Sequence, residues 1–258
     1  MWNGCSTSVF VDSNTSSGVV IPLAAYPVYV TLPTDDALRA DARHNRDLVL
    51  AAARDLFARQ GLSVSTNEVA RHAGVGVATL LRRFPTRDDL VAAVFADKMT
   101  AYRAAITDAL AEPDPWNGFC QFIERVCAMQ TSDRGFTDVL TRWFPAAPDL
   151  EAQRDRVARD FATLIGRAKA RGTLRPDFAH QDLIFILMAN AGIVAAAADA
   201  APAASKRMIA YLLQSFAAPA AGPLPKPPSK TAVLHALTAT PTPTSSEHQP
   251  PHPKRTPA

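Results

Sequence analysis

The sequence predicts an all-α fold for the ordered part of the chain, and three observations support this prediction. Stretches rich in Ala, Leu and Arg alternate with short breaks that contain Gly or Pro. No stretch keeps the two-residue alternation of polar and apolar residues that is typical of a strand. Apolar residues make up 48% of the 258 residues, which is enough for a packed core.

Composition and charge divide the chain into four segments. Residues 1–36 are rich in Ser, Thr, Val and Pro without helical periodicity, and residues 219–258 hold 11 of the 21 prolines. We expect both ends to be disordered, because they cannot bury enough apolar surface to offset the entropy of ordering. Residues 39–103 carry 11 basic and 7 acidic side chains, which is typical of a small nucleic-acid-binding module. We therefore predict such a domain at 37–86 and a larger helical domain at 87–218.

The first helix is expected at residues 37–60. It carries an apolar stripe that repeats every four residues, through Leu48, Ala52 and Leu56, so this face needs a partner to pack on. The helix is expected to end at Gly61, because glycine readily adopts the left-handed backbone of a helix C-terminus.

Two short helices are expected next, at 66–73 and 77–84. Ser65 and Glu68 have the spacing of a capping box, in which the hydroxyl and the carboxylate accept hydrogen bonds from free amides at the helix start. Gly74 supplies the left-handed backbone of a tight turn, and a second glycine two residues later caps the next helix. Two short helices joined by such a turn indicate a helix-turn-helix motif.

The second helix of this motif is expected to bury Leu80 and Phe84 and to present small and basic side chains to solvent. Small side chains approach base edges in the major groove, and arginines reach phosphates or a guanine. Thr86 caps a fourth helix at 87–111, where Arg87 and the free amides of the first turn are placed to hold a backbone phosphate. The residues expected to be exposed are Val77, Ala78, Thr79, Leu81, Arg82 and Arg83.

Five further helices are expected at 115–131, 136–144, 149–171, 180–200 and 203–216. The penultimate one has a face of small residues from Ala189 to Ala198, and the last one carries Ile209 and Leu213. Small residues let helices approach closely, so this pair is expected to form a four-helix dimer interface with its copy in a second chain. An ordinary buried helical hairpin is the alternative.

Residues 39–95 resemble the DNA-binding domain of the TetR family of bacterial transcriptional regulators, above all in the run ARDLFARQGLSVSTNEVARHAGVGVATLLRRFPTRDDLVAAVF. The turn and core positions of the family are in register throughout. The resemblance implies three N-terminal helices that bind DNA, a larger helical domain that binds a small ligand, and a homodimer. Leu81 stands where the family usually has a tyrosine that contacts the DNA backbone, so one hydroxyl contact is missing.

The motif and the resemblance together predict a transcriptional regulator, expected to be a repressor. It would bind a palindromic operator as a homodimer, with two recognition helices spaced by one duplex turn (~34 Å). Its net positive DNA-binding domain predicts binding that weakens steeply with salt. The predicted DNA contacts are the six exposed residues together with Arg43, Ser65, Thr66 and Arg87. For an isolated basic residue such as Arg43, an ordinary solvated position is the alternative.

The resemblance also implies a ligand cavity in the larger domain. A small, largely apolar effector would suit the aromatic residues that this domain offers. Asn190 interrupts an apolar stretch, so its amide is bonded within the core or faces a cavity or the dimer interface. The predicted ligand-binding residues are Trp116, Phe119, Cys120, Ile123, Trp143, Phe144, Phe161, Met188 and Asn190.

Other classes of protein have less support in the sequence. It contains no GxSxG, Gly-rich phosphate loop or HExxH, so we expect neither an enzyme nor a cofactor or metal site, and a helical enzyme without a recognisable motif is a weak alternative. A DNA-binding redox sensor that uses Cys120 and Cys127 is another alternative, against which their apolar surroundings predict raised thiol pKa values. Without a long apolar run or a basic signal region, we expect a cytoplasmic protein that does not enter a membrane.

Overall fold

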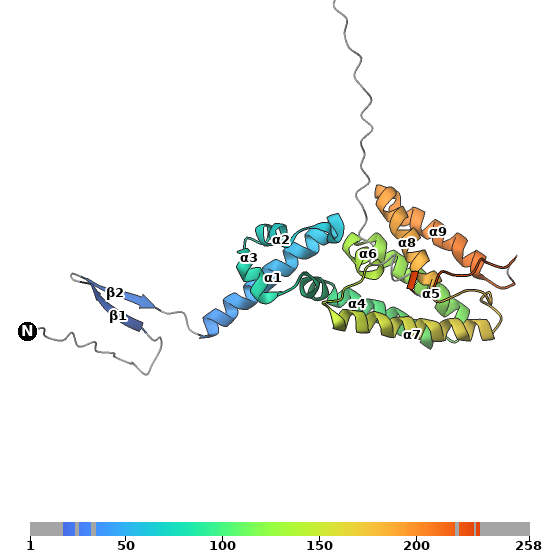
Figure 1. Ribbon diagram of the computed structural model, residues 1–258, viewed down its shortest axis with the longest axis horizontal. Helices are drawn as coiled ribbons and strands as arrows, with labels where there is room; N and C mark the ends of the chain where they lie inside the picture. Colours follow the sequence, from blue (N-terminus) through green and yellow to red (C-terminus); the bar gives the residue numbers. More distant parts are fainter. Residues whose placement is uncertain (1–17, 24–25, 32–34, 220–221, 230, 233–258) are drawn as a thin grey trace, which may run out of the picture.

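The computed structural model describes residues 18–23, 26–31, 35–219, 222–229 and 231–232. Its helices are α1 (Asp35–Gln60), α2 (Thr66–His72), α3 (Val77–Arg83), α4 (Arg87–Ala111), α5 (Pro115–Thr131), α6 (Arg134–Thr141), α7 (Pro148–Ala170), α8 (Asp182–Ala196) and α9 (Ala201–Phe216). Short 3-10 turns lie at Gly61–Ser63 and Ala198–Ala200. Helices α1 to α3 form a small unit and α4 to α9 a larger bundle (Figure 1).

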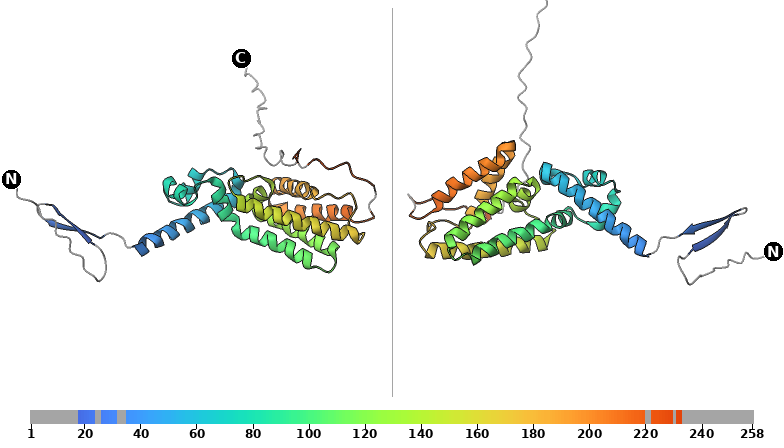
Figure 2. Two further views of the ribbon diagram at one scale, coloured as in Figure 1. Left: turned by 60° about the horizontal axis from the view of Figure 1, so that its bottom comes forward. Right: turned by 180° about the vertical axis from the view of Figure 1, so that it is seen from behind.

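Helix α4 connects the two units. It begins directly after α3 and runs into the larger bundle, where it packs along α5 and α7. Helix α1 packs against α2, α3 and the short helix α6, so the small unit rests on the larger one at this point (Figure 2). Helices α8 and α9 lie on the side of the bundle away from α4 and α7. In the described part of the chain, every helix is too short or too polar to span a bilayer.

A continuous row of aromatic rings joins the cores of the two units. Phe57 of α1 stacks on Phe95 of α4, with ring centroids 6.2 Å apart, and Phe95 lies 6.1 Å from Phe136 of α6. Tyr102 contacts both Phe136 and Phe122 further into the bundle. These side chains are almost fully buried. Because protein interiors are close-packed, a shift of α6 changes the packing on both sides of it.

The all-α prediction is confirmed for the helical body, and the predicted helices appear in their expected order. Helix α8 is shorter at both ends than the predicted 180–200. Helix α6 is shifted toward the N-terminus, because it begins and ends earlier than the predicted 136–144. Asp133 sets the start, since its Oδ1 accepts a hydrogen bond from the amide of Phe136 at 3.1 Å. As a result, Trp143 and Phe144 lie in the loop after α6.

A two-stranded antiparallel sheet precedes α1, where the sequence analysis predicts no regular structure. Strand β1 (Gly18–Leu23) pairs with strand β2 (Tyr26–Thr31) in a register that sets Val20 opposite Tyr29. Both strands are rich in β-branched and aromatic residues, whose preference for extended backbone outweighs the Ser- and Pro-rich composition of residues 1–36 as a whole. The other residues before α1 lie outside the described part of the chain.

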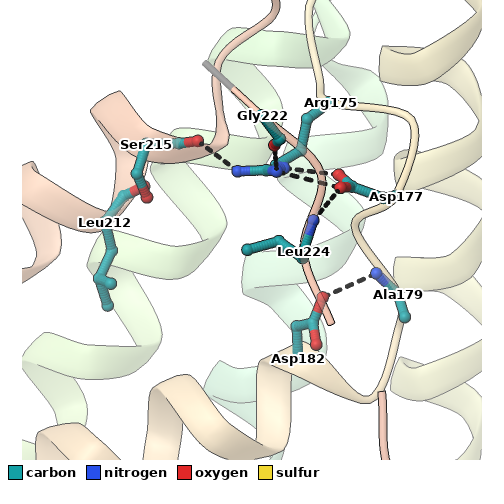
Figure 3. A network of polar contacts seen from close by, with 8 residues as sticks. All are labelled: Arg175, Asp177, Ala179, Asp182, Leu212, Ser215, Gly222 and Leu224. Carbon is teal, nitrogen blue, oxygen red and sulfur yellow. Dashed lines mark hydrogen bonds and ion pairs between the residues drawn. The ribbon is translucent and has the colours of Figure 1, made fainter. Parts of the chain in front are cut away.

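The segment after α9 is attached to the bundle through Arg175, in the connection between α7 and α8 (Figure 3). The Arg175 guanidinium donates to the carbonyl oxygens of Ser215, at 3.2 Å, and Gly222, and it forms an ion pair with Asp177. Asp177 also accepts a hydrogen bond from the amide of Leu224 at 2.8 Å. We call these five residues the C-terminal clamp.

The C-terminal clamp modifies the prediction of a disordered end from residue 219 onward. In the described residues 222–229 there is no helix or strand, which fits their many prolines. Their first residues are nevertheless bonded to the bundle, because the Arg175 side chain offers donors in several directions. The remainder of the predicted disordered segment lies outside the described residues, at 220–221, 230 and 233–258.

Candidate nucleic-acid interface and ligand cavity

The turn between α2 and α3 is built from local hydrogen bonds and one glycine. Ser65 caps α2, since its Oγ accepts from the amide of Glu68 at 3.2 Å. Among the described residues the reciprocal bond to the Glu68 carboxylate is missing, so half of the predicted capping box forms. Gly74 has φ +68°, and the amide of Val75 donates to the carbonyl oxygen of Ala70 at 3.0 Å. These contacts set the angle between α2 and α3.

Helix α3 buries one face and exposes the other. Leu80 is fully buried and Phe84 nearly so, which places them against α1 and α2. Val77 and Leu81 lie one turn apart on the opposite face, where they are 38% and 44% exposed, and Ala78 is exposed beside them. The exposed face therefore carries small and medium apolar groups, which suit contact with thymine methyl groups.

Polar groups border this apolar strip. Arg82 and Arg83 are exposed in the last turn of α3, and Arg82 Nη2 donates to Thr79 Oγ1 at 3.3 Å. Together with Asp41 and Asn45 of α1, these three residues line a hollow of about 430 Å³. The surface thus combines apolar groups and a hydroxyl with two cations, a combination that suits base edges and phosphates.

The four other predicted DNA contacts lie around α3. Arg43 is exposed on α1, Ser65 is exposed at the start of α2, and Thr66 is half-buried next to it. Arg87, the first residue of α4, is also half-buried, and its Nη1 donates to the carbonyl oxygen of Val64 at 2.8 Å. Burial lowers the pKa of Arg87. Part of this guanidinium braces the loop before α2, which leaves its other donors for a phosphate.

Asp138 of α6 joins the small unit to the larger bundle. Its Oδ2 accepts a hydrogen bond from the amide of Leu62 at 2.6 Å, and its Oδ1 lies 3.2 Å from Arg142. Gly61 has φ +71°, and a side chain there would come within 2.8 Å of the Asp138 carboxylate. Nothing in the local sequence identifies Asp138 as a contact residue, because only the packing of α6 on α1 brings it to Leu62.

A cavity of about 440 Å³ lies in the larger bundle, between α4, α7, α8 and the loop after α6. Two of the predicted ligand-binding residues, Trp143 and Phe161, line it. Its other apolar side chains include Leu140, Leu183 and Leu187. Its polar side chains are Tyr102, Glu151, Arg154, Asp155, Arg159, His180 and Gln181. In the sequence, Tyr102 has the spacing of a core residue on its helix, and Glu151 and Arg154 resemble an ion pair on a helix surface. Nothing in the sequence therefore indicates that these three residues line a cavity.

A buried ion pair connects this cavity to α6. Arg154 Nη1 and Glu151 Oε1 lie 3.0 Å apart, and both side chains are largely buried. Arg154 also donates to the carbonyl oxygens of Leu140, at 3.2 Å, and Arg142, while Glu151 accepts from the amide of Phe144 at 2.9 Å. The pair therefore holds the end of α6 and its following loop against α7. The same short helix contacts both the cavity and the small unit.

Five of the other predicted ligand-binding residues lie away from this cavity. Trp116 and Phe119 stack at 5.6 Å within the aromatic core of α5. Ile123 and Phe144 are buried, and Cys120 is half-buried on α5. Composition identifies such residues as members of the larger domain, whereas the direction of each side chain depends on how the helices pack.

Asn190 is bonded inside the bundle and does not face the cavity. Its Nδ2 donates to Gln130 Oε1 at 2.8 Å and to the carbonyl oxygen of Cys127 at 3.2 Å. Its Oδ1 accepts from Ser205 Oγ at 2.6 Å. Among the three positions that the sequence leaves open for Asn190, the structure thus selects the bonded core position. Met188 also lies away from the cavity, 41% exposed on α8.

Helices α8 and α9 expose an apolar face. Phe185 and Met188 are 36% and 41% exposed on α8, where Ala189 and Gly192 are also exposed. Tyr211 is 58% exposed on α9. Large apolar side chains next to small ones form the kind of surface on which a second helix pair packs, so the predicted dimer interface stays a prediction. Ile209 and Leu213 of α9, which the sequence assigns to this interface, are 2% and 7% exposed and instead pack in the core of their own bundle.

The two cysteines of the bundle have thiols of low reactivity. Burial raises the pKa of Cys127 to about 12, and burial together with Glu124 and Asp114 raises that of Cys120 to about 11. Such thiols are protonated at neutral pH and react slowly with oxidants, which disfavours the redox-sensor alternative. In the residues that the structure describes, no group of three or more His, Cys, Asp or Glu side chains is arranged to bind a metal ion.

Two family models match the chain, in the order of its two units. The family of bacterial regulatory proteins named tetR matches residues 49–94, and the C-terminal domain of SbtR-like transcriptional regulators matches residues 114–215. Together these matches cover more than half of the chain. An HTH-type transcriptional regulator from Staphylococcus aureus (strain MRSA252) is 36% identical over 81 residues, which are 30% of this chain and 42% of that protein.

Solved structures with this arrangement of helices are also similar to the chain. A TetR transcriptional regulator from Streptomyces coelicolor has 28% sequence identity and a TM-score of 0.44, over 68% of this chain and 99% of that one. A TetR transcription regulatory protein from Mycobacterium vanbaalenii has 29% identity and a TM-score of 0.41, over 70% of this chain and 99% of that one.

Proposed function

Because the chain belongs to the TetR family of bacterial transcriptional regulators, we propose that it binds a palindromic operator as a homodimer and that a small molecule in the cavity releases it from DNA. The main observation behind this proposal is the exposed face of α3. Val77 and Leu81 are held outward because Leu80 is packed inward, and Arg82 and Arg83 border them. Apolar groups next to cations on the exposed face of the second helix of a helix-turn-helix suit contact with base edges and phosphates.

The homodimer follows from the energetics of DNA binding. One small unit offers a few phosphate contacts and one short recognition helix, so alone it binds weakly. Two units on a twofold axis reach two half-sites one duplex turn apart (~34 Å) and require a palindrome. The exposed apolar face of α8 and α9 supports the twofold contact, since it lies on the larger bundle and leaves α3 free.

Release by a ligand requires a physical connection between the cavity and the DNA-binding surface. The contacts of α6 provide one, because Arg154 holds the end of α6 at the cavity and Asp138 of the same helix binds Leu62 of the small unit. A ligand that favours another position of α6 would shift the population away from the DNA-binding arrangement, by at most its difference in affinity for the two arrangements. The family favours repression over activation as the outcome of DNA binding.

Selection of bound duplexes from random DNA tests the proposal. With the full chain at modest ionic strength, we expect enrichment of an inverted repeat with half-sites one turn apart. The double variant Arg82→Ala, Arg83→Ala should enrich no sequence, while the matched variant Arg156→Ala, which removes an exposed arginine of α7, should enrich the same repeat as wild type. A wild-type selection without any enriched sequence would contradict the proposed function.

A further inference from the structure

Tyr102 brings a hydroxyl to the wall of the cavity. The residue is 5% exposed, and its ring packs on Phe122 at 5.9 Å and edge-on against Phe136 at 6.5 Å. Among the described residues, the Tyr102 hydroxyl has no hydrogen-bond partner, and its oxygen is not among the fully buried atoms, so it is accessible from the cavity that the residue lines. The ring is held in place, so the hydroxyl is available to a molecule in the cavity.

The buried charged groups at the cavity compensate each other. Glu151 and Arg154 form the buried pair described above, and Arg154 also binds two backbone carbonyls. Asp155, Arg159 and His180 also line the cavity, but they are exposed to solvent, where charges are strongly screened. Burial raises the pKa of Tyr102 to about 12, so its hydroxyl is an uncharged donor at neutral pH. A charged ligand would therefore lose its hydration without meeting an uncompensated buried charge of opposite sign.

The remaining walls of the cavity are mostly apolar. Phe161, Leu183 and Leu187 contribute buried apolar side chains, and Trp143 adds a large ring. Aromatic side chains stack favourably on flat rings. The cavity volume of about 440 Å³ lies in the range of roughly 300 to 1,000 Å³ that is usual for small-molecule sites. The volume and the aromatic lining thus suit a compact molecule that contains an aromatic ring.

We propose that the effector is an uncharged aromatic compound with a hydroxyl or carbonyl oxygen that hydrogen-bonds to the Tyr102 hydroxyl. This inference rests on the proposed function, because it takes the cavity as the effector site. It goes beyond the sequence-based expectation of a largely apolar ligand in two ways. It assigns the position of the polar atom of the ligand, and it excludes a carboxylate of the same size.

Three probes with one ring system test the chemistry of the ligand: 2-naphthol, naphthalene and 2-naphthoate. Equilibrium dialysis against the full chain without DNA measures their affinities. We expect 2-naphthol to bind more tightly than naphthalene by roughly 3- to 10-fold, the contribution of one hydrogen bond. We expect 2-naphthoate to bind most weakly, because the buried cation of the site, Arg154, is already paired with Glu151 and the other cation of the lining, Arg159, is exposed to solvent.

Tyr102→Phe isolates the contribution of the hydroxyl, since it removes one oxygen and keeps the ring. In this variant the affinity for 2-naphthol should fall to that for naphthalene, and the affinity for naphthalene should stay unchanged. Thr100→Val is the matched control, because it removes an exposed hydroxyl of the same helix outside the cavity. Thr100→Val should bind all three probes as wild type does, and circular dichroism confirms that both variants fold.

Three results would overturn the inference. They are tightest binding of 2-naphthoate, equal loss of affinity for 2-naphthol and naphthalene in Tyr102→Phe, or no binding of any probe up to its solubility. The comparison of probes on the wild-type chain keeps the test valid even where Tyr102→Phe does not fold. Addition of 2-naphthol to the protein–operator complex is a separate experiment. Binding of 2-naphthol without release of DNA would count against the proposed function and leave the ligand chemistry intact.

Discussion

Arg82 extends from the last turn of α3 beside the exposed apolar strip, and Thr79 holds it there through a hydrogen bond of 3.3 Å. We expect Arg82→Ala to weaken operator binding by about 1 to 3 kcal/mol, the usual contribution of an arginine that contacts guanine. Fluorescence anisotropy with labelled operator measures this change, and Arg156→Ala of α7 serves as the control. An affinity equal to that of wild type would show that Arg82 does not contact DNA.

The salt dependence of the same variant separates two kinds of contact. Loss of a phosphate contact lowers the slope of log affinity against log salt concentration by about 0.9, whereas loss of a base contact leaves the slope nearly unchanged. Leu81 bears on the same comparison, because it replaces a hydroxyl that the family usually directs at the DNA backbone. Because that hydroxyl is uncharged and displaces no counterion, its absence should weaken operator affinity without changing the slope.

Asp138 bonds the larger bundle to the small unit through the amide of Leu62. Asp138→Ala leaves the amide of Leu62 and the guanidinium of Arg142 without their shared carboxylate. Since hydrogen bonds to charged groups contribute about 1.5 to 3 kcal/mol, we expect a loss of that size in the free energy of unfolding, measured by urea denaturation. Asp97→Ala, an exposed substitution on α4, should change this free energy little.

The effect of Asp138→Ala on DNA release is the second part of this prediction. Ligand binding to the cavity should persist, because Asp138 does not line it. The concentration of ligand that releases half of the DNA should change, because α6 is no longer bonded to Leu62. Unchanged ligand release together with the expected loss of stability would show that α6 supports the fold without transmitting the signal.

At the scale of elements, the C-terminal clamp holds a segment that follows the last helix. The Arg175 guanidinium and the amide of Leu224 keep the pKa of Asp177 well below its usual range. A carboxyl group with a lowered pKa stabilises the folded state above the pKa of the unfolded carboxyl, about 4, and loses this effect only as the pH falls through the folded value. The clamp is therefore expected to persist into acidic solution.

Hydrogen exchange at the amide of Leu224 measures the clamp directly. In wild type this amide should be protected at neutral pH and also at about pH 4, where an ordinary aspartate is half protonated. Asp177→Asn removes the charge that Arg175 binds, so exchange of this amide should accelerate at both pH values. Asp199→Asn, which alters an exposed aspartate before α9, is the control and should leave it protected. Fast exchange of this amide in wild type would show that Leu224 is not held by Asp177 in solution.

The starts of the helices show where local sequence signals are sufficient to predict the structure. Helices α2, α3 and α4 begin within the predicted ranges because Ser65, Gly76 and Thr86 cap them, and a capping residue acts over three or four positions. The prediction was less accurate for α6, whose cap Asp133 precedes the apolar residues used to place the helix. The strands before α1 were not predicted at all, because composition averaged over a long segment hides a short run of residues that favour extended backbone.

At the scale of the whole molecule, the proposed dimer requires that a second copy bury the exposed apolar face of α8. Met188→Glu puts a charge into the exposed apolar face of α8, which a second copy would bury. We expect this variant to sediment as a monomer and to lose most of its affinity for the palindrome, because one small unit alone binds weakly. Thr163→Glu, on the exposed side of α7, should remain a dimer. A dimeric Met188→Glu protein would place the interface elsewhere.

The DNA-binding surface could largely be predicted from local sequence signals, whereas the lining of the ligand cavity could not. Five of the six residues of α3 that were predicted to be exposed are exposed, because a glycine turn and two inward apolar residues fix the outward face of a helix of this length. Thr79 is half-buried. Of the predicted ligand-binding residues, only Trp143 and Phe161 line the cavity. Each helix of the bundle has apolar residues on several faces, so the pattern does not show which of them surround a cavity.

The amino-acid sequence by itself determined the helices, the turn between α2 and α3 and the membership of the family, since caps, glycines and apolar periodicity act between residues close in the chain. Only the tertiary structure decided that Tyr102 and Arg154 face one cavity, that Asp138 binds Leu62, and that Asn190 is bonded in the core. These contacts join residues distant in the sequence, and they depend on the packing of whole helices rather than on any local preference.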